Sequence, residues 1–174
     1  MAGSAALIAY FSHAGQNYAN GEIVTLAVGN TEVAAKKLSE ITGARLMRIE
    51  QTESYPEDYH ELTEVAKKEF KAGARPALKS AIPDMTGVDT LFLGYPNWWG
   101  TMPMPVWTFL EALPTAGKAI APFCTNEGSG MGRSEKDLRA LCPAANIRPG
   151  LPIIGHKVHE AEALLRKWAR DILA

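Results

Sequence analysis

Short apolar clusters along the chain alternate with longer segments in which apolar residues recur every three or four positions. The clusters predict five strands, over residues 7–11, 45–49, 88–95, 119–124 and 151–154. The longer segments predict five helices, over 30–41, from 55–58 to 73, over 106–113, through 138–142 and over 158–172. Four of these helices end at a residue that commonly stops a helix, namely Gly43, Gly73, Pro114 and Pro143.

Alternating strands and helices imply an α/β fold, with a parallel sheet covered by helices on both faces. Residues 88–95 are apolar on both sides, as in a central strand, whereas the two arginines in 45–49 indicate an edge strand. The loops after the first, third and fourth strands then open at one edge of the sheet, where ligands bind in such folds. We expect one domain over residues 1–174, with residues 1–4 disordered or foreign to it.

Composition changes this picture mainly by excluding partners. The 18 basic and 19 acidic residues leave a net charge of −1, without the basic excess that nucleic-acid binding requires. No apolar run reaches the roughly 18 residues of a membrane span, and no secretory signal pattern opens the chain. Cys124 and Cys142 lack metal-binding spacing and are expected as small buried apolar residues, which fits a reducing cytoplasm.

Other candidate chemistry is sparse. Three histidines, His60, His156 and His159, fall on polar faces or loop edges and are expected to be solvated. We expect no metal site and no hydrolytic triad, because neither the spacing nor the order of the residues indicates one.

The first long polar segment begins with residues 12–17 and continues to the helix start at Asn30 and Thr31. An apolar strand that leads through such a loop to a helix start is an anion site, because backbone amides and the helix dipole favour negative charge. The only formal charge in the segment is Glu22, and it has neither a P-loop nor a G-x-G-x-x-G pattern. A single phosphate monoester is therefore the favoured anion, and a mobile polar loop is the alternative.

Two further loops open at the same predicted edge. Adjacent tryptophans, Trp98 and Trp99, lie in a loop flanked by glycine and proline, and their indole faces suit a planar aromatic ligand. The alternative is that both pack on the neighbouring helix. The third loop, residues 125–134, is rich in glycine and serine, so a ligand edge can approach its backbone closely. A turn followed by a helix N-cap would explain the third loop equally well.

A phosphate cradle, an aromatic platform and a backbone-rich loop at one sheet edge describe a site for flavin mononucleotide (FMN). The residues also resemble the flavodoxin family, in a branch of single-domain proteins with an expanded phosphate loop. The resemblance spans nearly the whole chain and is carried by Tyr10-Phe11-Ser12 with Gly29-Asn30-Thr31, residues 55–59, 94–100 and 124–130, and Gly132-Arg133-Ser134. The tandem tryptophan loop is its most specific part.

The resemblance implies a flavodoxin-like three-layer sandwich, with a five-stranded parallel sheet of order 2-1-3-4-5 that binds FMN without a covalent bond. It assigns the phosphate to Ser12, Asn30 and Thr31, helped by His13, Gln16 and Asn17. The residues implied to flank the flavin ring are Pro96, Asn97, Trp98, Trp99 and Gly100. The residues implied to contact the pyrimidine edge of the ring are Thr125, Asn126, Glu127 and Gly128.

Two features depart from the family pattern. An insertion, residues 16–28, divides the usual short phosphate motif, which affects the assignment of His13, Gln16 and Asn17. The third loop lacks the aromatic residue that many flavodoxins stack on the outer face of the ring. One of the tryptophans must therefore serve there, or that face is open.

The function expected from the resemblance is one-electron transfer to redox partner proteins, by a cytoplasmic monomer or weak dimer. A phosphate dianion without a compensating cation, next to a desolvated ring, should lower the potential of the second electron and stabilise the one-electron-reduced state. The near-neutral charge differs from that of strongly acidic flavodoxins, so an FMN-dependent NAD(P)H or quinone reductase stays open, with Arg133 or His13 near an open ring face. A flavin-free receiver-like module has the same topology but requires acidic residues where this chain has Ser12.

Overall fold

A parallel six-stranded sheet organises the molecule, and the computed structural model describes residues 5–174. The expectation for residues 1–4 lies outside the described residues. The strands of the sheet are β1 (Ala5–Tyr10), β4 (Arg45–Arg48), β5 (Val88–Pro96), β6 (Ala119–Asn126), β7 (Asn146–Ile147) and β8 (Leu151–Ile154). Their order is β4-β1-β5-β6-β7, with β8 also paired to β6. This is the predicted order 2-1-3-4-5, with the fifth strand divided into two short segments and with β4 at the edge as predicted.

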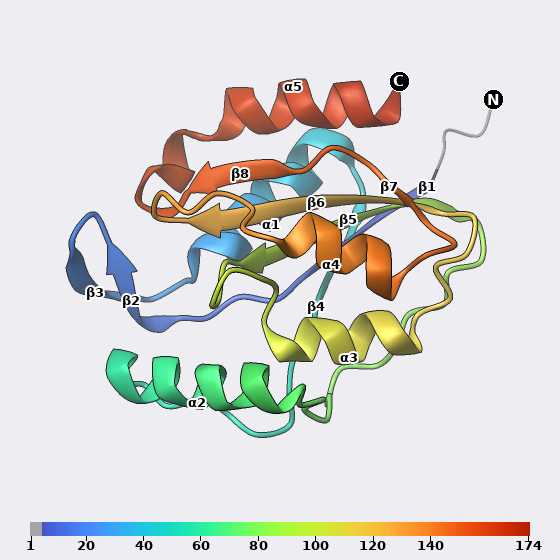
Figure 1. The fold of residues 1–174 in the computed structure, drawn as a ribbon. Coiled ribbons are helices and arrows are strands. Elements are labelled where there is room, and N and C mark those ends of the chain that lie inside the picture. The colour runs from blue at the N-terminus through green and yellow to red at the C-terminus, as the bar shows by residue number, and fades with distance from the viewer. Residues whose placement is uncertain (1–4) are drawn as a thin grey trace.

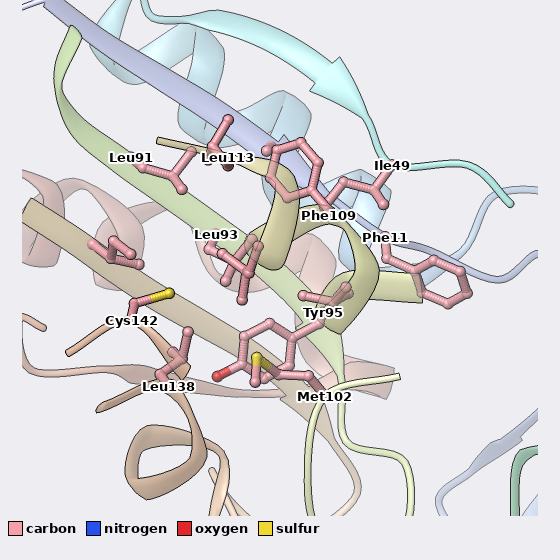
Figure 2. Close-up of a cluster of buried hydrophobic side chains, with 14 of the residues drawn as sticks. Phe11, Ile49, Leu91, Leu93, Tyr95, Met102, Phe109, Leu113, Leu138 and Cys142 are labelled. Atoms are coloured by element: carbon pink, nitrogen blue, oxygen red, sulfur yellow. The ribbon is translucent and has the colours of Figure 1, made fainter. Parts of the chain in front are cut away.

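Helices cover both faces of the sheet (Figure 1). The helices are α1 (Asn30–Thr42), α2 (Tyr59–Ala72), α3 (Met104–Ala112), α4 (Ser134–Leu141) and α5 (Glu162–Leu173). Side chains of a strand alternate between faces, so Ile8 packs in the layer of α1 and α5 while Leu7 packs in the layer of α3 and α4. Figure 2 shows part of the second layer, with Leu91 and Leu93 of β5 beside Phe109 of α3. The three-layer α/β prediction is confirmed.

The ends of the first two helices match the signals in the sequence. Gly43 and Gly73 both adopt the left-handed backbone, with φ of 71° and 60°, and close α1 and α2. At the start of α2 the Asp58 carboxylate accepts a hydrogen bond from the Glu61 amide at 2.9 Å. Asp58 is therefore the N-cap, and the helix begins at Tyr59 rather than within residues 55–58.

The insertion in the first loop is a β-hairpin, which the sequence analysis did not predict. Strands β2 (Gly15–Ala19) and β3 (Glu22–Leu26) pair antiparallel and project beyond the edge of the main sheet (Figure 1). The two turn residues, Asn20 and Gly21, have φ of 50° and 87°. Asn-Gly is the favoured pair for such a two-residue hairpin turn, so a signal for this hairpin was present in the sequence.

The predicted final helix, 158–172, is wrong in its first turn. A 3₁₀ helix, η1 (Gly155–Glu160), precedes α5. Residues three apart share one side of a 3₁₀ helix, so the buried Val158 and Ala161 fit this geometry as well as an α-helix. Apolar spacing of three could not distinguish the two.

Two smaller expectations can be compared directly with the structure. Cys124 and Cys142 are free and buried, as predicted, and burial raises the pKa of both thiols. Among residues 5–174, no helix is long and apolar enough to cross a membrane.

Candidate functional site

A cleft of about 580 Å³ lies where β1, β5 and β6 end, which is the edge predicted from topology. All the predicted site residues except Gly100 and Gly128 line it. It is also lined by seven residues that were not among the predicted site residues: Tyr18, Tyr59, Leu62, Thr63, Ala66, Ser129 and Gly155. The three predicted loops therefore converge, and the hairpin and α2 complete the walls.

One end of the cleft is formed by the start of α1. The first hydrogen bond of this helix runs from the Val33 amide to the Gly29 carbonyl at 3.2 Å, and the helix has no side-chain N-cap. The Ser12 hydroxyl accepts a hydrogen bond from the Glu32 amide at 3.1 Å, which brings the end of β1 against the helix start. A Cβ on Gly29 would lie 2.2 Å from the Ser12 Oγ. Only glycine therefore permits this close approach.

The same end of the cleft has the donors that an anion requires. The amides of Asn30 and Thr31 precede the first helical hydrogen bond, so the helix itself gives them no acceptor. The Thr31 hydroxyl lies 2.7 Å from the Thr125 hydroxyl, which joins the first and third loops. The donor set of amides and hydroxyls fits a phosphate group.

The Nε2 of His13 is the one buried side-chain nitrogen or oxygen in residues 5–174 that lacks a hydrogen-bond partner. The ring lines the cleft and lies edge to face with Trp98, at a centroid distance of 6.1 Å. Burial lowers the pKa of His13, and the positive charge of Arg48 acts in the same direction. This nitrogen has almost no accessible surface in the ligand-free cleft, so a hydrogen bond from it to a ligand would require the segment that covers it to move.

The charge at the cleft is as low as the sequence indicated. Within residues 5–174, no lysine or arginine lines it, and Glu127 is its only lining residue of fixed charge. Arg48 lies behind the first loop, where it donates to the Ser12 carbonyl at 3.2 Å and pairs with Glu32 at 2.9 Å. Any anion in the cleft is therefore held by dipoles and hydroxyls.

The two tryptophans have different environments. Trp98 is partly buried and lies edge to face with Phe11 and Tyr55, at centroid distances of 5.2 and 5.1 Å. Trp99 is 44% exposed, and its indole N–H donates to the Thr63 carbonyl of α2 at 3.0 Å. Trp99 is thus hydrogen-bonded to α2, whereas Trp98 packs against the buried cluster that includes Phe109 of α3.

The backbone around the tryptophans turns sharply. Trp98 and Thr101 exchange backbone hydrogen bonds of 3.0 and 3.2 Å across Trp99 and Gly100, both of which have positive φ. For a bulky residue such as Trp99 this conformation costs of order 1 kcal/mol or more. It directs consecutive indoles to different sides of the loop.

The side-chain amides of two predicted site residues, Asn97 and Asn126, form hydrogen bonds that shape the loops. The Asn97 side chain donates to the Gly130 carbonyl at 3.0 Å and accepts from the Gly100 amide at 3.0 Å. The Asn126 side chain similarly donates to the Ile153 carbonyl at 3.3 Å and accepts from the Gly128 amide at 2.9 Å. The resemblance implied that Gly100 and Gly128 contact the ligand. In the structure neither residue lines the cleft, and their amides instead hold the two loops in shape.

Glu127 forms a junction at the side of the cleft. Its carboxylate accepts from the His156 amide at 2.9 Å, contacts the His156 Nδ1 at 2.6 Å and accepts from the Asn20 amide at 3.4 Å. His60, His156 and His159 are all exposed, as predicted. The His156 ring is in addition paired with the Glu127 carboxylate. A Cβ on Gly155 would lie within 3 Å of both Glu127 and Asn30, so this junction abuts the helix start.

Arg133 does not line the cleft. Its guanidinium lies over the Phe70 ring at 4.5 Å and pairs with Asp137 at 3.3 Å. The prediction of Arg133 near an open ring face is therefore not supported by its position.

A family model described as flavodoxin matches residues 5–172, nearly the whole chain. The chain belongs to the flavodoxin family. Its flavodoxin fold and the residues of its cleft thus point to the same family as the segments quoted from the sequence. No curated protein sequence matches this flavodoxin.

Solved structures support the assignment. A candidate flavoprotein from Bacteroides eggerthii is 30% identical with a TM-score of 0.79, and the match covers 98% of this flavodoxin and 99% of that chain. A second, from Bacteroides uniformis, is 27% identical with a TM-score of 0.76, covering 97% and 99%. A flavoprotein from Lactobacillus acidophilus in complex with FMN is 19% identical with a TM-score of 0.66, covering 90% and 97%. The last likeness shows the fold alone.

The lining residues that sequence analysis missed come mostly from α2. Tyr59, Leu62, Thr63 and Ala66 recur with the spacing of one helix face, and this face lines the cleft. Tyr59, Leu62 and Ala66 follow the apolar periodicity from which this helix was predicted, and that periodicity does not distinguish a side chain facing the cleft from one facing the core. Tyr18 of the hairpin stacks on Tyr59 with centroids 6.4 Å apart, which extends the aromatic wall.

Proposed function

We propose that this flavodoxin binds FMN non-covalently in the cleft and transfers electrons to redox partner proteins. The proposal rests on one observation. The phosphate cradle at the start of α1 and the aromatic side chains of Tyr18, Tyr59 and Trp98 line the same cleft, and no lysine or arginine among residues 5–174 lines it. The likeness to a flavoprotein solved with FMN agrees with it. When bound, FMN would supply one-electron and two-electron redox chemistry.

The residues of the cleft divide between two tasks. The amides of Asn30 and Thr31 and the hydroxyl of Ser12 would hold the phosphate, with the His13 ring beside them in the lining of the cleft. Trp98 would exclude water from the ring. Because no lining cation compensates the phosphate, a further negative charge in the cleft is disfavoured. A redox titration should therefore resolve two one-electron steps, and a single two-electron wave would contradict this expectation.

The test of FMN binding is reconstitution of the purified protein. Titration with FMN should give saturable quenching of flavin fluorescence with a stoichiometry of one and a shifted flavin absorption spectrum. Ser12→Ala combined with Thr31→Ala should weaken binding of FMN by about tenfold or more but change riboflavin binding little, because the lost hydroxyls belong to the phosphate cradle. A protein that takes up no flavin would exclude the proposal.

The second candidate is an NAD(P)H or quinone reductase, for which Arg133 or His13 was expected near an open ring face. Of these two side chains only His13 lines the cleft, because Arg133 lies over Phe70. Steady-state oxidation of NADPH with a quinone, in the absence of a partner protein, would favour it. The cytoplasmic location, the partner proteins and the monomeric or weakly dimeric state stay predictions.

A further inference from the structure

The hairpin β2–β3 crosses the phosphate end of the cleft from one wall to the other. On one side the Gln16 side-chain oxygen accepts a hydrogen bond from the Tyr59 amide, the first residue of α2, at 2.8 Å. The stacking of Tyr18 on Tyr59 reinforces this attachment. Gln16 was assigned to the phosphate by resemblance, but its acceptor is used to fasten the hairpin to α2.

The tip of the hairpin is attached on the opposite side. The Asn20 amide donates to Glu127 at 3.4 Å, and the same carboxylate holds the start of η1 through His156. Both Glu127 and the Asn30 side chain lie within 3 Å of the point where a Gly155 Cβ would be. The hairpin tip, the third loop and the start of α1 therefore meet at one place beside the cradle.

The hairpin contains no lysine or arginine. Among the residues that line the cleft, Glu127 is the only one with a fixed charge. A ligand whose phosphate continued into a second phosphate on the hairpin side of the cradle would come against Tyr18 and Glu127, which both line the cleft. It would meet a fixed carboxylate there and no lysine or arginine. The Glu127 carboxylate is paired with His156 on its other side. A second phosphate beside it would add a like charge that no lining cation offsets, which is unfavourable, the more so where water is partly excluded.

From these contacts we infer that the β2–β3 hairpin is a specificity element, which closes the cleft beyond the phosphate and restricts the ligand to flavins that end in a phosphate monoester. Flavin dinucleotides, whose phosphate is esterified further, are excluded by the hairpin and by Glu127. The inference rests on the proposed flavin function and adds to it the reason for selecting a mononucleotide.

The experiment compares FMN, flavin adenine dinucleotide (FAD) and riboflavin by fluorescence titration of the full chain. In one variant a two-residue Asn-Gly turn replaces residues 19–22; Tyr18 and Ile23 are paired partners, so a short turn can rejoin the strands while Tyr18 is kept. A second variant, Glu127→Gln, removes the carboxylate. Glu22→Gln is the matched control, because it removes one exposed charge from the same hairpin at a residue outside the cleft.

The wild-type protein should prefer FMN to FAD by about 100-fold or more, and the shortened hairpin should reduce that ratio by about tenfold or more through tighter FAD binding. Riboflavin affinity should stay within about twofold, because it has no phosphate. Glu127→Gln should move the ratio in the same direction, by about tenfold, and the control should keep the wild-type ratio. If the shortened chain does not fold, Glu127→Gln and the wild-type ratio still decide the question.

Three results would overturn the inference. These are equal wild-type affinity for FMN and FAD, an unchanged ratio in both variants, or a parallel loss of all three ligands that marks a structural role alone. In each of them FMN binding itself would persist in the wild type. Failure of the wild-type protein to bind any flavin would instead overturn the proposed function.

Discussion

At the scale of single residues, His13 makes the stability of the ligand-free protein depend on pH. Burial lowers its pKa below the ordinary 6.5, so the unfolded chain takes up this proton at higher pH than the folded chain. The free energy of unfolding should therefore fall as pH decreases below about 6.5 and level off once the folded state is also protonated. His13→Gln should reduce this fall, as measured by urea unfolding across the range. An identical pH dependence in the variant would show that His13 does not cause it.

At the scale of elements, the junction between β1 and α1 depends on Gly29. In Gly29→Ala the new Cβ would overlap the Ser12 hydroxyl, so the end of β1 and the start of α1 must separate. We expect FMN affinity to fall by about tenfold or more, because the phosphate donors on the two segments no longer converge. Isothermal titration calorimetry measures this directly.

The control for that prediction lies at the other end of α1. Gly43→Ala meets no neighbouring atom, but its φ of 71° is unfavourable for alanine. It should reduce the stability of the same helix by about 1 kcal/mol while FMN affinity is retained. Equal losses of affinity in both variants would indicate that general destabilisation, rather than the junction, is responsible.

At the scale of the whole molecule, the cleft is bounded by segments from β1 to η1, so a ligand bound there should stabilise the entire fold. FMN at 100 times its dissociation constant should add about 2.7 kcal/mol to the free energy of unfolding. For a chain of this length that raises Tm by roughly 5–10 °C. Differential scanning calorimetry with FMN, and with inorganic phosphate as a control for the phosphate alone, measures the shift. No increase with FMN would contradict binding to the folded state.

The layers of the fold could be predicted because each buried element repeats its own period. Leu91 and Leu93 lie in a run that is apolar on both sides, which only a covered central strand explains. The hairpin escaped prediction because one face of it is exposed, with Tyr18 and Ile23 both more than 40% exposed, so apolar alternation is weak there. Val158 was placed in the wrong kind of helix because a spacing of three suits both kinds.

The amino-acid sequence by itself determined the alternation of strands and helices and the edge at which three polar loops meet, because side-chain periodicity and chain connectivity suffice for both. The spatial order of the strands was implied only by the resemblance to the flavodoxin family. The sequence also determined the absence of lysine and arginine from the first loop. Only the tertiary structure decided which side chains face the cleft. Arg133 lies over Phe70, Gln16 is hydrogen-bonded to the start of α2, and Glu127 contacts His156. Each of these contacts depends on a partner that is distant in the sequence. Local patterns contain no information about such partners, because folding alone brings them together.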